Sequence, residues 1–106
     1  MDKLRRVRVL TEDQKPNVPA ERLRIEKMGG RVIQSRDKNG SMTDEYRVFL
    51  SVNDISEGLT VSRSIGDLKA KKIGVICEPE IKHFNLEEDD QILILASDGI
   101  WKHMTI

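Results

Sequence analysis

Residues 91–101 have the sequence QILILASDGIW. It contains the run Ile92–Ala96, in which no polar residue interrupts the apolar ones. A continuous apolar run of this kind is typical of a strand that is buried on both faces of a sheet. Because Ser97-Asp98-Gly99 follows at once, the sequence predicts a carboxylate at the mouth of a buried strand.

Two interpretations of Asp98 are open on this stretch alone. A carboxylate that is held rigidly and still reaches solvent suits a hard metal ion. The alternative is structural, because Asp-Gly is a common turn dipeptide and a Ser or Asp before Ile100-Trp101 can cap a helix. Without further information the turn-and-cap interpretation is favoured.

The composition limits the classes of protein that this chain can belong to. Its 106 residues make one small domain at most, and an apolar share of 38% makes a large independent core doubtful. Lys plus Arg and Asp plus Glu both number 18, so the balance of charge argues against a nucleic acid or an anionic membrane as partner.

Cysteine usage and hydropathy point to an intracellular protein, in the cytoplasm or the nucleus. The single cysteine, Cys77, excludes an internal disulfide framework, fits a reducing compartment and is expected to be a core residue on a strand before Pro79. No apolar run approaches the roughly 20 residues of a membrane span. The segment Met1–Arg6 lacks the apolar region of a secretory signal.

The spacing of apolar residues and of turn residues predicts both helices and strands. A helix is expected over Ala20–Met28, ended by Gly29 in the left-handed conformation. A short helix or turn is expected over Leu68–Lys72, and another helix from Ile100 onward. The predicted strands are Val7–Thr11, Arg31–Gln34, Tyr46–Val52, Ile73–Cys77, Ile81–Leu86 and the run in 91–96.

Five sequence blocks occur in an order that is specific in combination, and together they span nearly all of residues 10–104. They are Leu10–Pro16, Glu21–Gly30, Thr60–Asp67, Gly74–Ile81 and Ala96–Trp101. In these blocks the chain resembles the metal-dependent protein serine/threonine phosphatases of type 2C, the PPM family.

The resemblance implies an α+β fold, as a partial segment of the family's four-layer α-β-β-α sandwich. Residues 1–106 would form an incomplete domain that corresponds to its middle and C-terminal part. Residues 35–59 would form the flap-like region beside the active site, and we expect this region to be the least ordered.

The resemblance also implies a chemistry. In the family, two Mn²⁺ or Mg²⁺ ions activate a bridging water that attacks the phosphorus of the substrate, without a covalent intermediate. Asp98 matches a metal-binding carboxylate of the family, and Asp13 matches the acidic residue of an Asp-His-Lys-Pro motif that is linked with a weaker metal site. Gln14 replaces the His of that motif. No catalytic residue other than the metal ligands is assigned.

Several positions qualify this assignment. The family's Asp-Gly-His-Gly and Asp-Asn motifs, which carry further metal ligands, have no counterpart in the chain. Lys102 stands where the family commonly has Asp, and a cation there should repel the weaker metal. Ser62 is expected to be structural, and Arg63 is expected to pair with Asp67 or to brace the base of the flap.

Two functions therefore remain open. The first is a fragment of a metal-dependent phosphatase that hydrolyses phosphoserine or phosphothreonine in a phosphoprotein substrate and that is inactive as this isolated chain. The second is a non-catalytic pseudophosphatase or protein-interaction module, in which the flap-like region and Arg63 bind a partner. Lys102 and Gln14 favour the second modestly.

Overall fold

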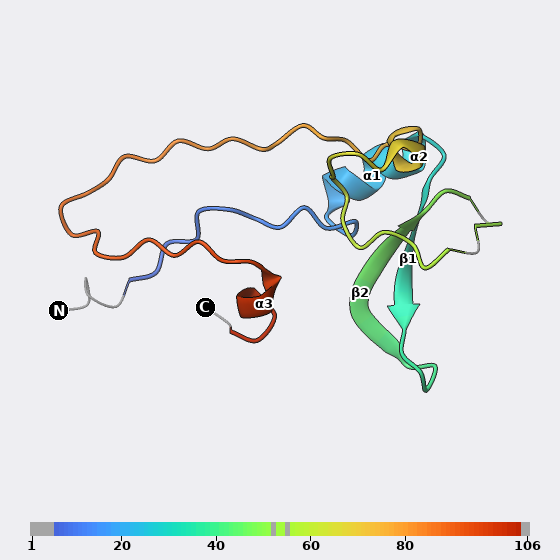
Figure 1. Ribbon diagram of the computed structural model, residues 1–106, viewed down its shortest axis with the longest axis horizontal. Coiled ribbons are helices and arrows are strands. Elements are labelled where there is room, and N and C mark those ends of the chain that lie inside the picture. Colours follow the sequence, from blue (N-terminus) through green and yellow to red (C-terminus); the bar gives the residue numbers. More distant parts are fainter. Residues whose placement is uncertain (1–5, 52, 55, 105–106) are drawn as a thin grey trace. The chain divides into compact units, whose positions relative to one another are not determined.

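The computed structural model describes residues 6–51, 53–54 and 56–104 (Figure 1). The chain divides into two compact units, and each is described by itself. One unit is Asp13–Glu80, and the other joins residues up to Glu12 with Ile81 onward. The first unit contains helix α1, strands β1 and β2 and helix α2, and the second contains helix α3.

Helix α1 spans Pro19–Lys27, within one residue of the predicted bounds. Pro19 stands in the first turn, where its missing N–H has no intrahelical partner to lose. The helix ends because Gly29 adopts a left-handed backbone conformation, with φ of +92°. The helix prediction and the conformation predicted for Gly29 are confirmed.

Strands β1, Arg31–Arg36, and β2, Met42–Phe49, form a two-stranded antiparallel sheet. In this hairpin Val32 pairs with Val48, and the register shifts between Gln34 and Arg36. Both strands extend further toward the turn than predicted. A short turn, residues 37–41, therefore joins the two strands. Val52, the predicted last residue of the second strand, lies outside the described residues.

The core of the first unit is small. Its buried apolar side chains are Ile25, Val32, Val48 and Val75. Around them pack the partly buried Tyr46, Leu59, Ala70 and Ile73. Helix α1 thus lies against the hairpin, at the end opposite the turn in Figure 1.

The segment after the hairpin is mostly irregular. Helix α2, Leu68–Lys71, confirms the short helix predicted there. The strand predicted over Ile73–Cys77 is wrong, because among the described residues this segment makes a single bridge, between Arg63 and Ile76. Cys77 is exposed, so its predicted place in the core is also wrong.

The second unit contains α3, Asp98–Trp101, and no strand in its described part. The strands predicted over Val7–Thr11 and Ile81–Leu86 are wrong, and so is the buried strand in 91–96, whose apolar side chains are exposed. A strand needs a neighbouring strand to satisfy its backbone groups, and the described part of this unit offers none.

Helix α3 begins two residues earlier than predicted. Ser97 occupies the position before its first residue in an extended conformation, although no side-chain hydrogen bond caps the helix. The indole Nε1–H of Trp101 donates to the carbonyl oxygen of Ala96 at 2.8 Å. Asp98 therefore follows an extended segment and opens a helical turn, which agrees with the turn-and-cap interpretation of this stretch.

The chain has helices and a small antiparallel sheet, which confirms the predicted α+β class. In the described part of the chain, no helix is both long and apolar enough to cross a membrane.

Candidate functional site

Asp98 is the first residue of α3, and its side chain is exposed. Its carbonyl oxygen accepts a hydrogen bond from the Lys102 N–H at 2.9 Å, so one helical turn separates the two residues. Side chains four residues apart lie on the same face of a helix. The ammonium group of Lys102 therefore belongs to the same face as the carboxylate, which weakens that face as a cation site.

Asp13 lies in the other unit, on the loop that leads into α1. The Asp13 carbonyl oxygen accepts from the Lys15 N–H at 3.1 Å, and the neighbouring Gln14 carbonyl oxygen accepts from the Ser62 N–H at 3.0 Å. Pro16 is fully buried, so the loop is anchored after Asp13. The Asp13 side chain itself is exposed.

The candidate ligands among the described residues do not complete a metal centre. No group of three or more His, Cys, Asp or Glu side chains that could hold a metal occurs among the described residues. A Mn²⁺ or Mg²⁺ ion needs several oxygen ligands, and Asp98 and Asp13 supply one carboxylate each, in different units. Both remain predicted ligands, and neither has enough further ligands among the described residues of its own unit to form a site.

A buried ion network was missed in the sequence. The carboxylate of Glu21, on α1, is only 3% exposed. It accepts hydrogen bonds from Arg63 Nε at 2.8 Å and Nη2 at 3.0 Å, and from Arg24 Nη1 at 2.7 Å and Nη2 at 3.1 Å. The hydroxyl of Ser62 donates a further bond at 2.8 Å.

This network corrects the role predicted for Arg63. The structure pairs its guanidinium with Glu21 rather than with Asp67, and its Nη1 donates to the carbonyl oxygen of Glu78 at 2.9 Å. Arg24 donates to the carbonyl oxygens of Gly74 at 2.7 Å and Ser62 at 3.0 Å. The two arginines therefore connect α1 to two segments that have little regular structure.

The electrostatics of the network argue against nucleophilic catalysis by Ser62. The hydrogen bonds from Arg63, and then those from Arg24 and Ser62, hold the pKa of Glu21 well below its usual range, although burial acts in the opposite direction. A carboxylate with so low a pKa is a weak base, so Glu21 does not activate the Ser62 hydroxyl. This agrees with the structural role expected for Ser62.

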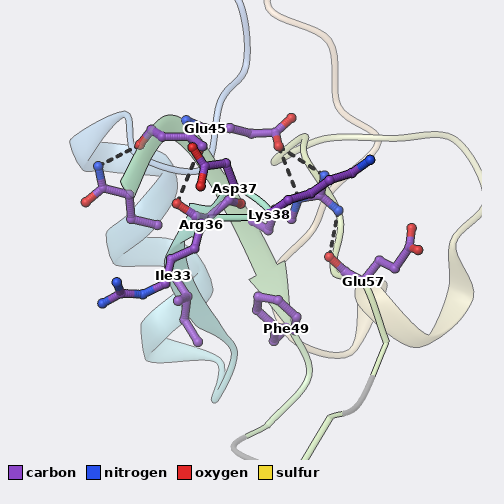
Figure 2. Close-up of a pocket in the computed structure, with 11 residues that line it drawn as sticks. Ile33, Arg36, Asp37, Lys38, Glu45, Phe49 and Glu57 are labelled. Atoms are coloured by element: carbon purple, nitrogen blue, oxygen red, sulfur yellow. Dashed lines mark hydrogen bonds and ion pairs between the residues drawn. The ribbon is translucent and has the colours of Figure 1, made fainter. Parts of the chain in front are cut away.

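The face of the hairpin that points away from the core forms a shallow groove (Figure 2). Ile33 and Arg47 pair across the two strands on this face, opposite to the face that carries Val32 and Val48. The guanidinium of Arg47 donates to the Glu45 carboxylate at 3.0 Å and to the carbonyl oxygen of Glu57 at 2.8 Å. The groove is lined by residues 33–38 and by residues of β2 and the loop that follows it, and it combines apolar side chains with charges of both signs.

Asp54 holds the loop that follows β2 through two hydrogen bonds. Its carboxylate accepts the N–H of Leu50 at 2.8 Å and the N–H of Ser56 at 2.9 Å. These bonds, that from Leu50 first, lower the pKa of Asp54. The loop after β2 is thus closed by its own side chain rather than by the core.

Comparison with known proteins gives one consistent result. A family model described as protein phosphatase 2C matches residues 2–106. The rice (Oryza sativa subsp. japonica) protein named "Probable protein phosphatase 2C 64" is 46% identical over 92 residues, which cover 87% of this chain and 20% of that protein. The Arabidopsis thaliana protein named "Probable protein phosphatase 2C 41" is 43% identical over 96 residues, or 91% of this chain and 26% of that protein.

The matched region is a minor part of each relative. The chain spans 16% to 26% of the length of the relatives compared. No solved structure matches the chain at a significant level.

Proposed function

The chain belongs to the protein phosphatase 2C family, and from this premise we propose its function. We propose that it forms part of a metal-dependent protein phosphatase that hydrolyses phosphoserine or phosphothreonine in a phosphoprotein. The observation that carries the proposal is the match of the family model over residues 2–106. The free, exposed thiol of Cys77 supports an intracellular setting.

In this proposal the chain supplies a framework and one principal metal ligand. Asp98, at the start of α3, is the ligand, and the network around Glu21 fixes α1 against residues 62–63 and 74–78. In the family, bound Mn²⁺ or Mg²⁺ supplies an activated water and neutralises charge on the phosphoryl group. The described residues do not complete that metal centre, so we assign no catalytic step to them.

The first experiment is an assay of the chain as it stands. We expect no Mn²⁺-dependent hydrolysis of p-nitrophenyl phosphate, because the described residues bring together no set of metal ligands. Turnover above the blank that disappears in the Asp98→Ala variant would contradict this expectation.

The second experiment restores a complete set of ligands. Residues 2–106 replace the corresponding segment of the Arabidopsis relative, and the unmodified relative is the positive control. We expect the hybrid to hydrolyse a phosphothreonine peptide with Mn²⁺, and the Asp98→Asn variant of the hybrid to fold and lose that activity. A folded hybrid without activity, beside an active control, would contradict the catalytic proposal.

Lys102 supports a second candidate function, a pseudophosphatase or interaction module. The residue lies one helical turn after Asp98, where a cation opposes the binding of a metal ion. In this case the hybrid would be inactive, and the Lys102→Asp change would restore turnover. If the parent hybrid is active and Lys102→Asp adds only tighter Mn²⁺ binding, the catalytic proposal is favoured.

A further inference from the structure

Ser62 is fully buried, and each of its polar groups has a partner inside the first unit. Its N–H donates to the carbonyl oxygen of Gln14 at 3.0 Å, and its hydroxyl donates to Glu21 Oε1 at 2.8 Å. Its carbonyl oxygen accepts from Arg24 Nη2 at 3.0 Å. Ser62 therefore joins the loop before α1 to α1 itself, although it lies much later in the sequence.

These contacts belong to the interior of the first unit. Ser62 has no exposed surface, and Pro16, on the loop before α1, is also fully buried. The arrangement therefore does not depend on which outer surfaces of the unit are free. A buried polar group that loses its partner costs free energy, so Ser62 is held in one position.

The bond to Gln14 is a long-range contact of the loop that carries Asp13. Within this loop the Lys15 N–H donates to the Asp13 carbonyl oxygen and the Val18 N–H donates to that of Lys15, both at 3.1 Å. These bonds join near neighbours and fix only the local bend. The bond from Ser62 ties the loop to a distant segment at the residue next to Asp13. The backbone position of Asp13 therefore follows that of Ser62.

We propose that Ser62 is a positioning residue that sets the place of Asp13. Its hydroxyl fixes Ser62 on the Glu21 carboxylate, and its N–H in turn holds the Gln14 carbonyl group and the adjoining backbone of Asp13 beside α1. The use of Asp13 as a metal ligand rests on the proposed function. The positioning is a property of the chain without metal, so the two can fail separately.

The Ser62 hydroxyl can be removed without loss of the whole network. In Ser62→Ala, Glu21 keeps its hydrogen bonds from Arg63 and Arg24, and the N–H of residue 62 remains. The variant loses only the bond that anchors the side chain of residue 62 to α1. We therefore expect Ser62→Ala to fold and to loosen the loop that carries Asp13.

Nuclear magnetic resonance of the full chain without metal tests the proposal. In Ser62→Ala, the protection of the residue 62 amide against hydrogen exchange should fall at least about fivefold, because one hydrogen bond to a charged group is lost. The backbone chemical shifts of Asp13 and Gln14 should move toward random-coil values. The amides of Val48 and Leu59, which bond to each other's carbonyl oxygens at 2.7 and 2.9 Å, are the reference amides and should keep their protection.

Ser64→Ala is the matched control. The Ser64 hydroxyl belongs to the same segment and accepts from Lys71 Nζ at 3.4 Å, so it bonds to α2 rather than to α1. We expect the signals of Asp13 and Gln14 to be unchanged in this variant. Ser62→Cys is a second test variant, because a thiol is close to a hydroxyl in size but is a weak donor. It should loosen the loop as Ser62→Ala does, and it decides the test if Ser62→Ala does not fold.

Unchanged shifts of Asp13 and Gln14 in folded Ser62→Ala, or parent-like shifts in Ser62→Cys, would overturn the proposal. An equal effect of Ser64→Ala would overturn it too. So would a loss of protection at the reference amides as large as that at residue 62, because such a loss is a general destabilisation. None of these measurements uses metal or turnover, so a failure of the catalytic proposal would leave their outcome unchanged.

Discussion

At the scale of single residues, Glu21 holds a buried negative charge through Arg63, Arg24 and Ser62. Arg63→Met removes two of the hydrogen bonds and leaves that charge short of partners. We expect the local stability of α1 to fall by roughly 2–4 kcal/mol. Hydrogen exchange of the α1 amides measures the loss.

Arg22→Met is the matched control for that change. Arg22 pairs with Glu26 on the same helix, but both side chains are about half exposed. Removal of an exposed pair should cost less than about 1 kcal/mol. Equal losses of α1 stability in Arg63→Met and Arg22→Met would show that the buried network around Glu21 stabilises the helix no more than an exposed ion pair does.

The lowered pKa of Glu21 gives stability a defined dependence on pH. The pKa of Glu21 is lower in the folded state than in the unfolded state. Ionised Glu21 therefore adds its full contribution to the free energy of unfolding above about pH 4.3, and this contribution is lost as the pH falls toward the folded-state pKa. In Glu21→Gln the stability of α1 should be lower at pH 7 and should change less between pH 5 and pH 3. Glu26→Gln, at an exposed position, should retain the parent's pH dependence. An unchanged pH profile in Glu21→Gln would refute this linkage.

One contact of the network could have been predicted from the sequence. Glu21 and Arg24 are three residues apart on a predicted helix, a spacing that brings side chains together. The bond from Arg63 spans 42 positions, and no local pattern encodes it. The pairing of Arg63 with Asp67 was predicted instead because nearness in sequence was the only guide.

At the scale of elements, the packing of α1 depends on Gly74. A Cβ added there would lie 3.0 Å from the Arg24 carbonyl oxygen and from Ile25 Cα, both of them backbone atoms. Gly29 has almost the same φ, +92° against +90°, but a Cβ added to it meets nothing within 4 Å. Substitution of either glycine by alanine therefore carries the same cost for a left-handed backbone, and only the substitution at Gly74 adds a steric clash.

We expect Gly74→Ala to destabilise the first unit more than Gly29→Ala. Gly29→Ala should cost about 1 kcal/mol, the conformational penalty alone. Gly74→Ala should cost at least about 1 kcal/mol more, because helix α1 must move away from the segment it packs on. Urea unfolding of both variants, followed through Tyr46 beside the core, measures the difference. Equal costs would show that the close approach at Gly74 is unimportant.

The elements show where local patterns succeed and where they fail. Helix α1 was predicted within one residue, because Pro and Gly mark its ends. The run in 91–96 was predicted as a buried strand, but burial needs partner strands, which the described residues do not supply.

At the scale of the whole molecule, the family was predictable and the metal site was not. Five short blocks in one order sufficed for the resemblance, and the family match over residues 2–106 confirms it. The resemblance implied the α+β class, which is also confirmed. The predicted ligands Asp13 and Asp98 stand in separate units, so their joint action depends on tertiary relations that no local pattern contains.

We propose that Asp98 is a metal ligand in a phosphatase 2C domain. The most direct test of this proposal is a calorimetric titration of Mn²⁺ into the Arabidopsis hybrid and into the Asp98→Asn hybrid, with folding checked by circular dichroism. We predict that the substitution weakens Mn²⁺ binding at least about tenfold, or 1.4 kcal/mol, because the amide keeps the shape but loses the charge. Equal Mn²⁺ affinities for two folded hybrids would contradict the claim.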